Sequence, residues 1–244
     1  MNLVIDIGNT RIKAALFNGS EMTESVNDDE RSKKLSDFLK DHHTKITNCL
    51  ISSVAEMPKT LKKALRSLKN KPQLLSPGTR IPFKNNYKTK NTLGKDRIAS
   101  IAGACALYPL KNVLIIDAGT ALTFDLKTSQ EEYLGGNISP GLHMRFRALT
   151  DYTAGLPLVK SSDEFNLLGI DTEHAIRNGV QNGLIFEIDS YTETVRNKYN
   201  DLVVLLTGGD AHFFDNKLKK PIFVVSDLTL IGLNFILQYN AEKV

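Results

Sequence analysis

One short pattern occurs twice in this chain of 244 residues and constrains its fold more than any other feature. Each copy is an apolar run followed by an aspartate, one residue and a glycine: VIDIGNT from Val4 and IIDAGT from Ile115. A buried strand that ends in a carboxylate is unusual, because burying an unpaired charge is costly. Two copies roughly 110 residues apart indicate two similar domains and not a short-period repeat.

Hydrophobic periodicity around each copy predicts strands and helices in a similar order. In the first half we expect strands over 3–7, 12–17, 21–26, 46–54 and 73–75, helices over 28–42, 58–68 and 95–108, and a long loop over 76–92. In the second half we expect strands over 113–118, 121–126, 132–136, 202–206 and 222–225, and helices within 141–153, 172–199 and 228–240. The boundary falls near Lys111, which predicts domains of residues 1–111 and 112–244.

The composition, with 41% hydrophobic and 24% charged residues, is that of a globular protein. The net charge of +4 is spread along the chain, which suits a small anionic substrate and argues against nucleic acid as a partner. No apolar run is long enough to predict a membrane span, and no leader pattern opens the chain. Cys49 and Cys105 lie in apolar stretches, which favours buried free thiols and a cytoplasmic location.

Two glycine turns carry the residue types that phosphate binding requires, and the small residues of a third would let a flat nucleoside lie against the backbone. They are Asp6 with Gly8, Asn9, Thr10 and Lys13; Asp117 with Gly119 and Thr120; and Thr207-Gly208-Gly209-Asp210. Glycine brings backbone N–H groups close to an anion, and an aspartate at a strand end can hold a cation that bridges to phosphate. A single turn of this kind is more often only structural, whereas three related turns in one chain indicate a nucleotide site.

These motifs resemble those of the acetate and sugar kinase, Hsp70 and actin superfamily. Within it, two further elements resemble the type III pantothenate kinases: Gly94-Lys95-Asp96-Arg97 and Gly135-Gly136-Asn137-Ile138-Ser139-Pro140-Gly141. The resemblance covers the whole chain, in motif order and in spacing. It implies an α/β fold of two duplicated ribonuclease H-like (actin-like ATPase) domains, with mixed sheets flanked by helices.

The resemblance further implies ATP-dependent phosphorylation of pantothenate, the first step of coenzyme A biosynthesis. The residues that would bind ATP are Asp6, Ile7, Gly8, Asn9, Thr10, Arg11, Ile12, Lys13 and Thr120. Asp6 would also hold magnesium, directly or through a water molecule. Asp117 matches the ligand of a monovalent cation, potassium or ammonium.

For the second substrate, the resemblance implies that pantothenate binds to Tyr87, Gly94, Lys95, Asp96, Arg97 and Thr172. Asp96 would take the proton of the attacking hydroxyl, and Arg97 would clamp the carboxylate, roles that suit these side chains. No role is assigned to the side chain of Lys95. Thr172 would reach the site of a neighbouring subunit, which implies a homodimer. Lys90 stands where many members have a proline.

Three alternatives remain open at this point. The chain could phosphorylate another small alcohol or carboxylate through the same nucleotide site, or it could be a non-catalytic, nucleotide-responsive regulator of the same fold. For Asp96 and Arg97 alone, a helix cap followed by a surface arginine is the structural alternative. The presence of Asp96 together with two intact phosphate turns favours catalysis.

Overall fold

The computed structural model describes residues 1–28, 33–164 and 166–241, and its backbone forms two compact units. The first unit comprises Met1–Leu110, Lys127–Leu134 and the chain from Asp227 onward; the second comprises Lys111–Leu126 and Gly135–Ser226. The first division therefore falls next to Lys111, where the sequence predicts the boundary. Duplicated domains at 1–111 and 112–244 stay a prediction, because compactness does not test common origin.

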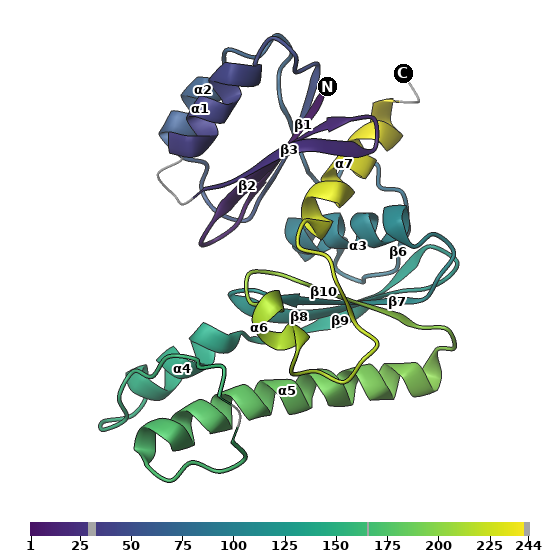
Figure 1. The fold of residues 1–244 in the computed structure, drawn as a ribbon. Coiled ribbons are helices and arrows are strands. Elements are labelled where there is room, and N and C mark those ends of the chain that lie inside the picture. Colours follow the sequence, from purple (N-terminus) through teal and green to yellow (C-terminus); the bar gives the residue numbers. More distant parts are fainter. Residues whose placement is uncertain (29–32, 165, 242–244) are drawn as a thin grey trace. The chain divides into compact units, whose positions relative to one another are not determined.

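The first unit is built on a five-stranded sheet with the order β3-β2-β1-β4-β5. Its strands are β1 (Asn2–Ile7), β2 (Ile12–Asn18), β3 (Glu21–Asp28), β4 (Asn48–Ser53) and β5 (Gln73–Leu74), and its helices are α1 (Lys33–His42), α2 (Lys59–Leu65), α3 (Lys95–Leu107) and α7 (Leu228–Ala241). β1 runs antiparallel to β2 and parallel to β4, so the sheet is mixed. Helices α1 and α2 cover one face, and α3 and α7 cover the other (Figure 1).

Strand β1 is buried on both faces, which explains its nearly continuous apolar sequence. Leu3, Ile5 and Ile7 alternate toward the helix pair α1–α2 and share a core cluster with Leu35 and Leu61. The alternate residue Val4 is equally buried, on the side of the sheet that α7 contacts. This central strand therefore delivers Asp6 to its carboxyl end with apolar packing on either side.

Helix α3 packs against α7 at a point where two glycines meet. A Cβ atom on Gly232 would lie 1.8 Å from the carbonyl oxygen of Ala99 and 2.6 Å from the backbone nitrogen of Gly103. Only glycine permits backbones to approach this closely. The last helix of the chain thereby becomes part of the first unit, where it supports helix α3, which carries Asp96 in its first turn.

The tip of a later hairpin also belongs to the first unit. The ammonium group of Lys127 is fully buried and lies 2.9 and 3.0 Å from the two carboxylate oxygens of Glu131. It also donates to the carbonyl oxygen of Tyr108 at 2.9 Å, just past the end of α3. A buried ammonium requires such partners, so this hairpin tip holds the carboxyl end of α3.

The second unit carries most of a six-stranded sheet with the order β11-β10-β7-β8-β9-β6. Its elements are β7 (Val113–Ala118), β8 (Ala121–Lys127), β9 (Glu132–Pro140), α4 (Leu142–Asp151), α5 (Thr172–Lys198), β10 (Val203–Thr207), α6 (Ala211–Asp215) and β11 (Phe223–Val224); the edge strand β6 is Lys84–Asn85. The long helix α5 packs along this sheet (Figure 1) and joins its core through Leu184 and Ile188.

Most of the predicted elements are confirmed, but several differ, among them β9, which runs to Pro140 and not to Gly136. Asp28 ends strand β3, and its carboxylate accepts from the backbone nitrogen of Leu35 at 2.9 Å, so the predicted helix from 28 begins later; residues 29–32 lie outside the described residues. The loop over 76–92 contains β6 and a 3₁₀ turn at Lys90–Thr92. Helix α6 was not predicted.

Both cysteines are free and buried, as the sequence predicts. None of the helices within the described residues is long and apolar enough to cross a membrane.

Candidate functional site

The first predicted phosphate turn joins β1 to β2. The backbone nitrogen of Gly8 donates to the carbonyl oxygen of Arg11 at 3.0 Å, and a Cβ atom on Gly8 would approach the same oxygen to 3.2 Å. Asn9, Thr10 and Arg11 are exposed, whereas the flanking Ile7 and Ile12 are buried. The turn thus presents three polar side chains, and any contact that the two isoleucines make to ATP would come from their backbone.

Asp6 is the electrostatic centre of this turn. It lies opposite Lys13 on β2 and opposite Ser52 on β4. Burial raises the pKa of Asp6 to about 6; the nearby Ser52 hydroxyl lowers it, the charge of Asp96 raises it, and Lys13 lowers it. Asp6 and Asp96, 90 positions apart in the sequence, are therefore close enough to interact electrostatically.

One carboxylate oxygen of Asp6 indicates whether the turn could bind a metal ion. Oδ1 of Asp6 and Oγ of Ser52 are buried and have no hydrogen-bond partner among the described residues. No cluster of three or more histidine, cysteine, aspartate or glutamate side chains occurs in those residues. Mg²⁺ does not need one, because it keeps several waters and binds through one or two carboxylates plus substrate phosphates. The unpartnered oxygen of Asp6 fits that mode.

The start of helix α3 places the predicted base. Gly94 is the N-cap residue, and Oδ1 of Asp96 accepts from the backbone nitrogen of Arg97 at 2.9 Å. A Cβ atom on Gly94 would lie 2.4 Å from this same Oδ1, so a side chain there would displace the Asp96 carboxylate. Asp96 and Lys95 are partly exposed. The Gly-x-Asp-Arg spacing therefore has a steric reason, with Gly94 leaving room for the carboxylate.

Arg97 is 5% exposed, so it is not the surface arginine of the structural alternative. Its Nη2 donates to the hydroxyl of Tyr133 at 2.9 Å. Its guanidinium carbon lies 5.7 Å from the ring centroid of Tyr87, another residue predicted to contact pantothenate. The structure therefore brings together four predicted site residues in the first unit: Asp6, Tyr87, Asp96 and Arg97.

In the second unit, the turn after β7 is crowded by glycines. Gly208 has φ +98°, and a Cβ atom on it would lie 2.5 Å from Oδ1 of Asp117 and 2.4 Å from the carbonyl oxygen of Ala118. A Cβ on Gly141 would lie 2.3 Å from the carbonyl oxygen of Gly119. Three separate segments thus meet at the Asp117 turn. It offers a carboxylate and backbone carbonyls, which are ligand types that suit a monovalent cation.

Thr120 is exposed in this turn, and the third predicted turn follows β10 beside it. The backbone nitrogen of Asp210 donates to the carbonyl oxygen of Ala118 at 2.9 Å. The backbone nitrogen of Gly141 donates to the carbonyl oxygen of Thr120 at 3.2 Å. Backbone hydrogen bonds therefore join the turn after β7 both to the turn after β10 and to the segment at Gly141.

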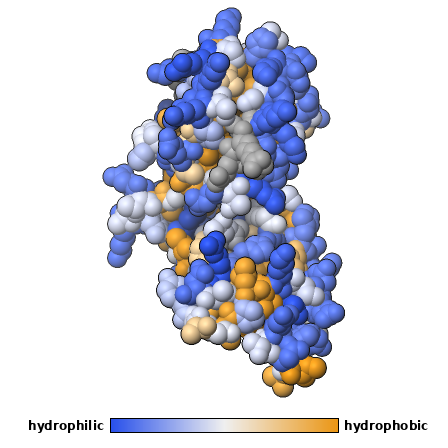
Figure 2. Space-filling model, turned by 90° about the vertical axis from the view of Figure 1, so that its left-hand side faces the viewer, coloured by the Kyte–Doolittle hydropathy of each residue, from blue (hydrophilic) through white to orange (hydrophobic). Residues whose placement is uncertain are grey.

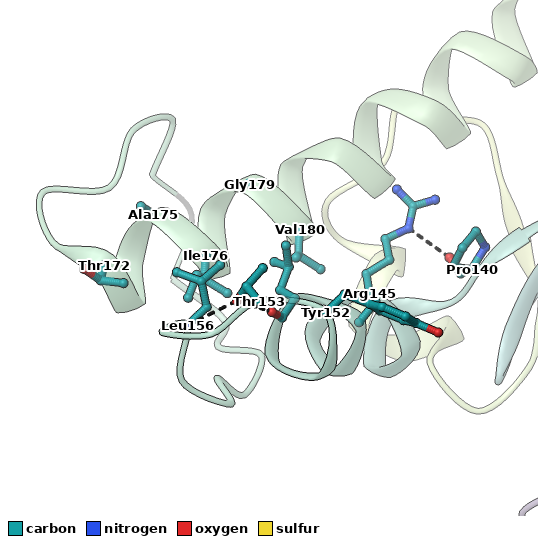
Figure 3. A pocket seen from close by; sticks show the side chains of 12 residues that line it. Pro140, Arg145, Tyr152, Thr153, Leu156, Thr172, Ala175, Ile176, Gly179 and Val180 are labelled. Atoms are coloured by element: carbon teal, nitrogen blue, oxygen red, sulfur yellow. Dashed lines mark hydrogen bonds between the residues drawn. The ribbon is translucent and has the colours of Figure 1, made fainter.

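Thr172 lies apart from these turns in the fold, at the first residue of α5. It lines a groove of about 840 Å³ between α4 and α5, shown in Figure 3. The groove is lined mainly by small and apolar residues: Pro140, Arg145, Ala148, Leu149, Tyr152, Thr153, Leu156, Thr172, Ala175, Ile176, Gly179 and Val180. Tyr152 is 89% exposed at its edge.

Two residues around the first-unit site were not predicted from the sequence, namely Ser52 and Tyr133. Ser52 is a fully buried hydroxyl at the end of an apolar strand, and this break in the apolar run is a signal that could have found it. Tyr133 lies two positions before the glycine pair of the second family element. No pattern in the sequence connects it with Arg97.

The comparisons with known proteins agree on one family. A family model described as type III pantothenate kinase matches residues 2–194. A protein named type III pantothenate kinase from Christiangramia forsetii is 44% identical over 249 residues, with 100% of both chains covered. These matches extend over the motifs after β1, at the start of α3 and along β9.

Solved structures share the fold at low sequence identity. A conserved Campylobacter jejuni protein assigned to the Baf family of transcriptional activators has a TM-score of 0.64 at 23% identity, with 98% of this chain and 99% of that chain covered. A Listeria monocytogenes protein described as an N-acetylmannosamine kinase has a TM-score of 0.55 at 11% identity, with 98% and 99% covered. These likenesses confirm the predicted architecture of mixed sheets flanked by helices.

The matched family model spans most of the chain, and the Christiangramia forsetii relative aligns with all of it. On these grounds the chain belongs to the type III pantothenate kinase family.

Proposed function

We propose that this chain transfers the γ-phosphoryl group of ATP to the 4′-hydroxyl of pantothenate, the first step of coenzyme A biosynthesis. The observation that carries the proposal is the convergence of Asp96, Arg97 and Tyr87 with the Asp6 turn in one compact unit. Phosphoryl transfer depends mainly on positioning and charge stabilisation, and this arrangement supplies groups for both.

Asp96 acts as the base in this proposal. A partly exposed carboxylate at the first turn of α3 can accept the proton of a substrate hydroxyl as the oxygen attacks phosphorus. Its fixed hydrogen bond to the backbone nitrogen of Arg97 leaves the second carboxylate oxygen for that task. Arg97, the next residue, binds the pantothenate carboxylate as a planar fork.

The predicted effect of Asp96→Asn is a loss of turnover by at least a hundredfold, because an amide cannot accept the proton. Steady-state phosphorylation of pantothenate measures the loss. Calorimetric binding of pantothenate and the thermal unfolding midpoint should stay close to wild type. Glu193→Gln, which alters an exposed carboxylate near the other end of α5, is the matched control and should leave the rate unchanged. A near-normal rate in Asp96→Asn would remove Asp96 as the base.

The Asp6–Lys13 turn holds the phosphates of ATP in this proposal. Asn9, Thr10 and Arg11 are exposed donors, and Lys13 adds positive charge beside Asp6. Asp6 would hold Mg²⁺, directly or through water, and the ion would neutralise charge on the phosphates. The exposed Thr120 of the second unit would contribute a further ATP contact.

The raised pKa of Asp6 predicts that the free energy of unfolding falls as the pH rises. Its pKa rises from 3.8 to about 6 on folding, so the folded state binds more protons between these values and loses stability as pH increases through that window. In metal-free buffer at pH 7.5, Asp6→Asn should therefore raise the free energy of unfolding by about 3 kcal/mol. At pH 4 most of this gain should be absent.

Urea unfolding at the two pH values measures this difference. Asp37→Asn, which alters an exposed pair with Lys40, should have a small effect at both. If Asp6→Asn lowers stability equally at pH 4 and pH 7.5, the cost does not come from the buried charge.

Asp117 would hold a monovalent cation, potassium or ammonium, together with oxygen ligands of the crowded turn. The argument is the close approach of three glycine-containing segments to one carboxylate in the second unit. Replacing potassium by sodium should reduce the rate at least tenfold, because carbonyl-lined sites select by ion size and ligand field. Equal rates in the two salts, at matched ionic strength, would contradict this role.

A homodimer is the best account of the exposed groove between α4 and α5. Residues with small side chains follow one side of α5 at Ala175, Gly179 and Gly183, and nothing lies within 4 Å of a Cβ atom on either glycine. Tyr152, Leu158 and Phe186 add exposed apolar surface in the same unit. Figure 2 shows apolar side chains gathered on the surface of the second unit. A second copy of the chain would cover this surface, and Thr172 would reach the pantothenate site of that partner.

Mixing two inactive variants tests the shared site. Asp96→Asn lacks the base, and Thr172→Arg places a bulky cation where the partner's substrate would bind. In a mixed dimer one of the two sites has both native residues, so co-refolded variants should recover about a quarter of the wild-type rate. Sedimentation velocity establishes the oligomeric state of each sample. A monomer, or no recovery from proven mixed dimers, would contradict the shared site.

Two finer points also belong to this proposal. Free, buried Cys49 and Cys105 suit the reducing conditions of a cytoplasmic location. A panel of small alcohols and hydroxy acids beside pantothenate tests the alternative of a different acceptor. Phosphorylation of another compound with no reaction of pantothenate would leave the kinase chemistry intact and overturn the substrate.

A further inference from the structure

Tyr133 is the largest fully buried side chain of the protein among the described residues. It lies in β9, outside the Asp6 turn and outside the Gly94–Arg97 element. Its hydroxyl accepts from Nη2 of Arg97 at 2.9 Å. A buried hydroxyl needs a partner, and a bond to a charged donor is among the stronger ones.

The ring of Tyr133 contacts Tyr87, a second residue that is proposed to bind pantothenate. It stacks on Tyr87 with ring centroids 6.0 Å apart and planes 22° apart. Phe83 meets it edge-on at 6.4 Å and 79°. The guanidinium carbon of Arg97 also lies 5.7 Å from the ring centroid of Tyr87. Each of the three side chains of Tyr87, Arg97 and Tyr133 therefore contacts the other two.

The backbone of Tyr133 fixes the segment that carries Tyr87. Tyr133 pairs in register with Asn85 of β6, and its carbonyl oxygen accepts from the backbone nitrogen of Asn86 at 3.0 Å. The side chain of Asn85 in turn accepts from the backbone nitrogen of Tyr87 at 2.9 Å. One residue therefore contacts both parts of the pantothenate site, the helix start at Arg97 and the loop at Tyr87.

We propose that Tyr133 is a positioning residue that orients Arg97 and Tyr87 for recognition of the pantothenate carboxylate. An arginine side chain has several rotatable bonds, and ordering it on binding costs free energy. The Tyr133 hydroxyl orders one edge of the guanidinium before the substrate arrives. The planar guanidinium of Arg97 then binds the pantothenate carboxylate in a fixed direction, and the Tyr87 ring contacts the face of the guanidinium. This inference rests on the proposed function.

Tyr133→Phe tests it, because the variant keeps the ring and its packing and removes only the hydroxyl. We expect the KM for pantothenate to rise about tenfold, while kcat and the KM for ATP change less than twofold. The preference for pantothenate over its primary amide, measured as the ratio of kcat/KM values, should fall by a similar factor, since the hydroxyl acts through a group that reads the carboxylate charge. Tyr191→Phe, a stacked tyrosine of the second unit, is the matched control and should change none of these values.

A double-mutant cycle separates positioning from general stability. In an Arg97→Lys background, Tyr133→Phe should have little further effect on the Kd of pantothenate measured by calorimetry. An unchanged KM for pantothenate in Tyr133→Phe would overturn the inference, and so would equal losses toward pantothenate and its amide, or full additivity in the cycle. If the wild-type chain does not phosphorylate pantothenate, the proposed function itself fails; if it does and Tyr133→Phe behaves as wild type, only this inference fails.

Discussion

The first-unit site depends on one electrostatic constraint, the carboxylate of Asp6 at the end of a strand that is buried on both faces. Removing an ionised carboxylate from water is costly unless it is paired, and Oδ1 of Asp6 has no hydrogen-bond partner among the described residues. The nearby charge of Asp96 adds to that cost. In the proposed complex, a magnesium ion bound with ATP would offset both contributions. The raised pKa of Asp6 is the measurable sign of this arrangement.

Close packing of the backbone explains why glycine stands at several of the motif positions. At Gly94 a side chain would occupy the place of the Asp96 carboxylate, and at Gly208 it would meet both Asp117 and the carbonyl oxygen of Ala118. The first glycine makes room for a proton acceptor, and the second lets two turns meet around one carboxylate. Glycine in these motifs therefore has a steric role in addition to its freedom in φ, and the motif spacing follows from local geometry.

The sequence was sufficient to predict the parts of the site that are local in the chain. The apolar run before Asp6, the glycine turn after it and the helix that begins at Lys95 each depend on neighbouring residues. The position of α7 in the first unit and the contact between Arg97 and Tyr133 depend on tertiary packing, for which one sequence carries no periodic signal. Ser52 is an intermediate case. The break in an apolar strand marks a buried hydroxyl, but the position of Ser52 opposite Asp6 follows from the parallel register of β1 and β4.

The two kinds of residue at this site solve different physical problems. In the proposed reaction Asp6 would hold a cation and Asp96 would accept a proton, and the two carboxylates are close enough to interact electrostatically. In the proposed function Arg97 would distinguish a carboxylate from a neutral group, which requires direction more than charge, because water competes well for an unordered cation. Buried Tyr133, whose hydroxyl accepts from the guanidinium, would supply that direction without adding a charge of its own. In this proposal, recognition of pantothenate uses residues of strand β9 and helix α3, whereas the donors proposed to bind phosphate lie on the exposed turn after β1.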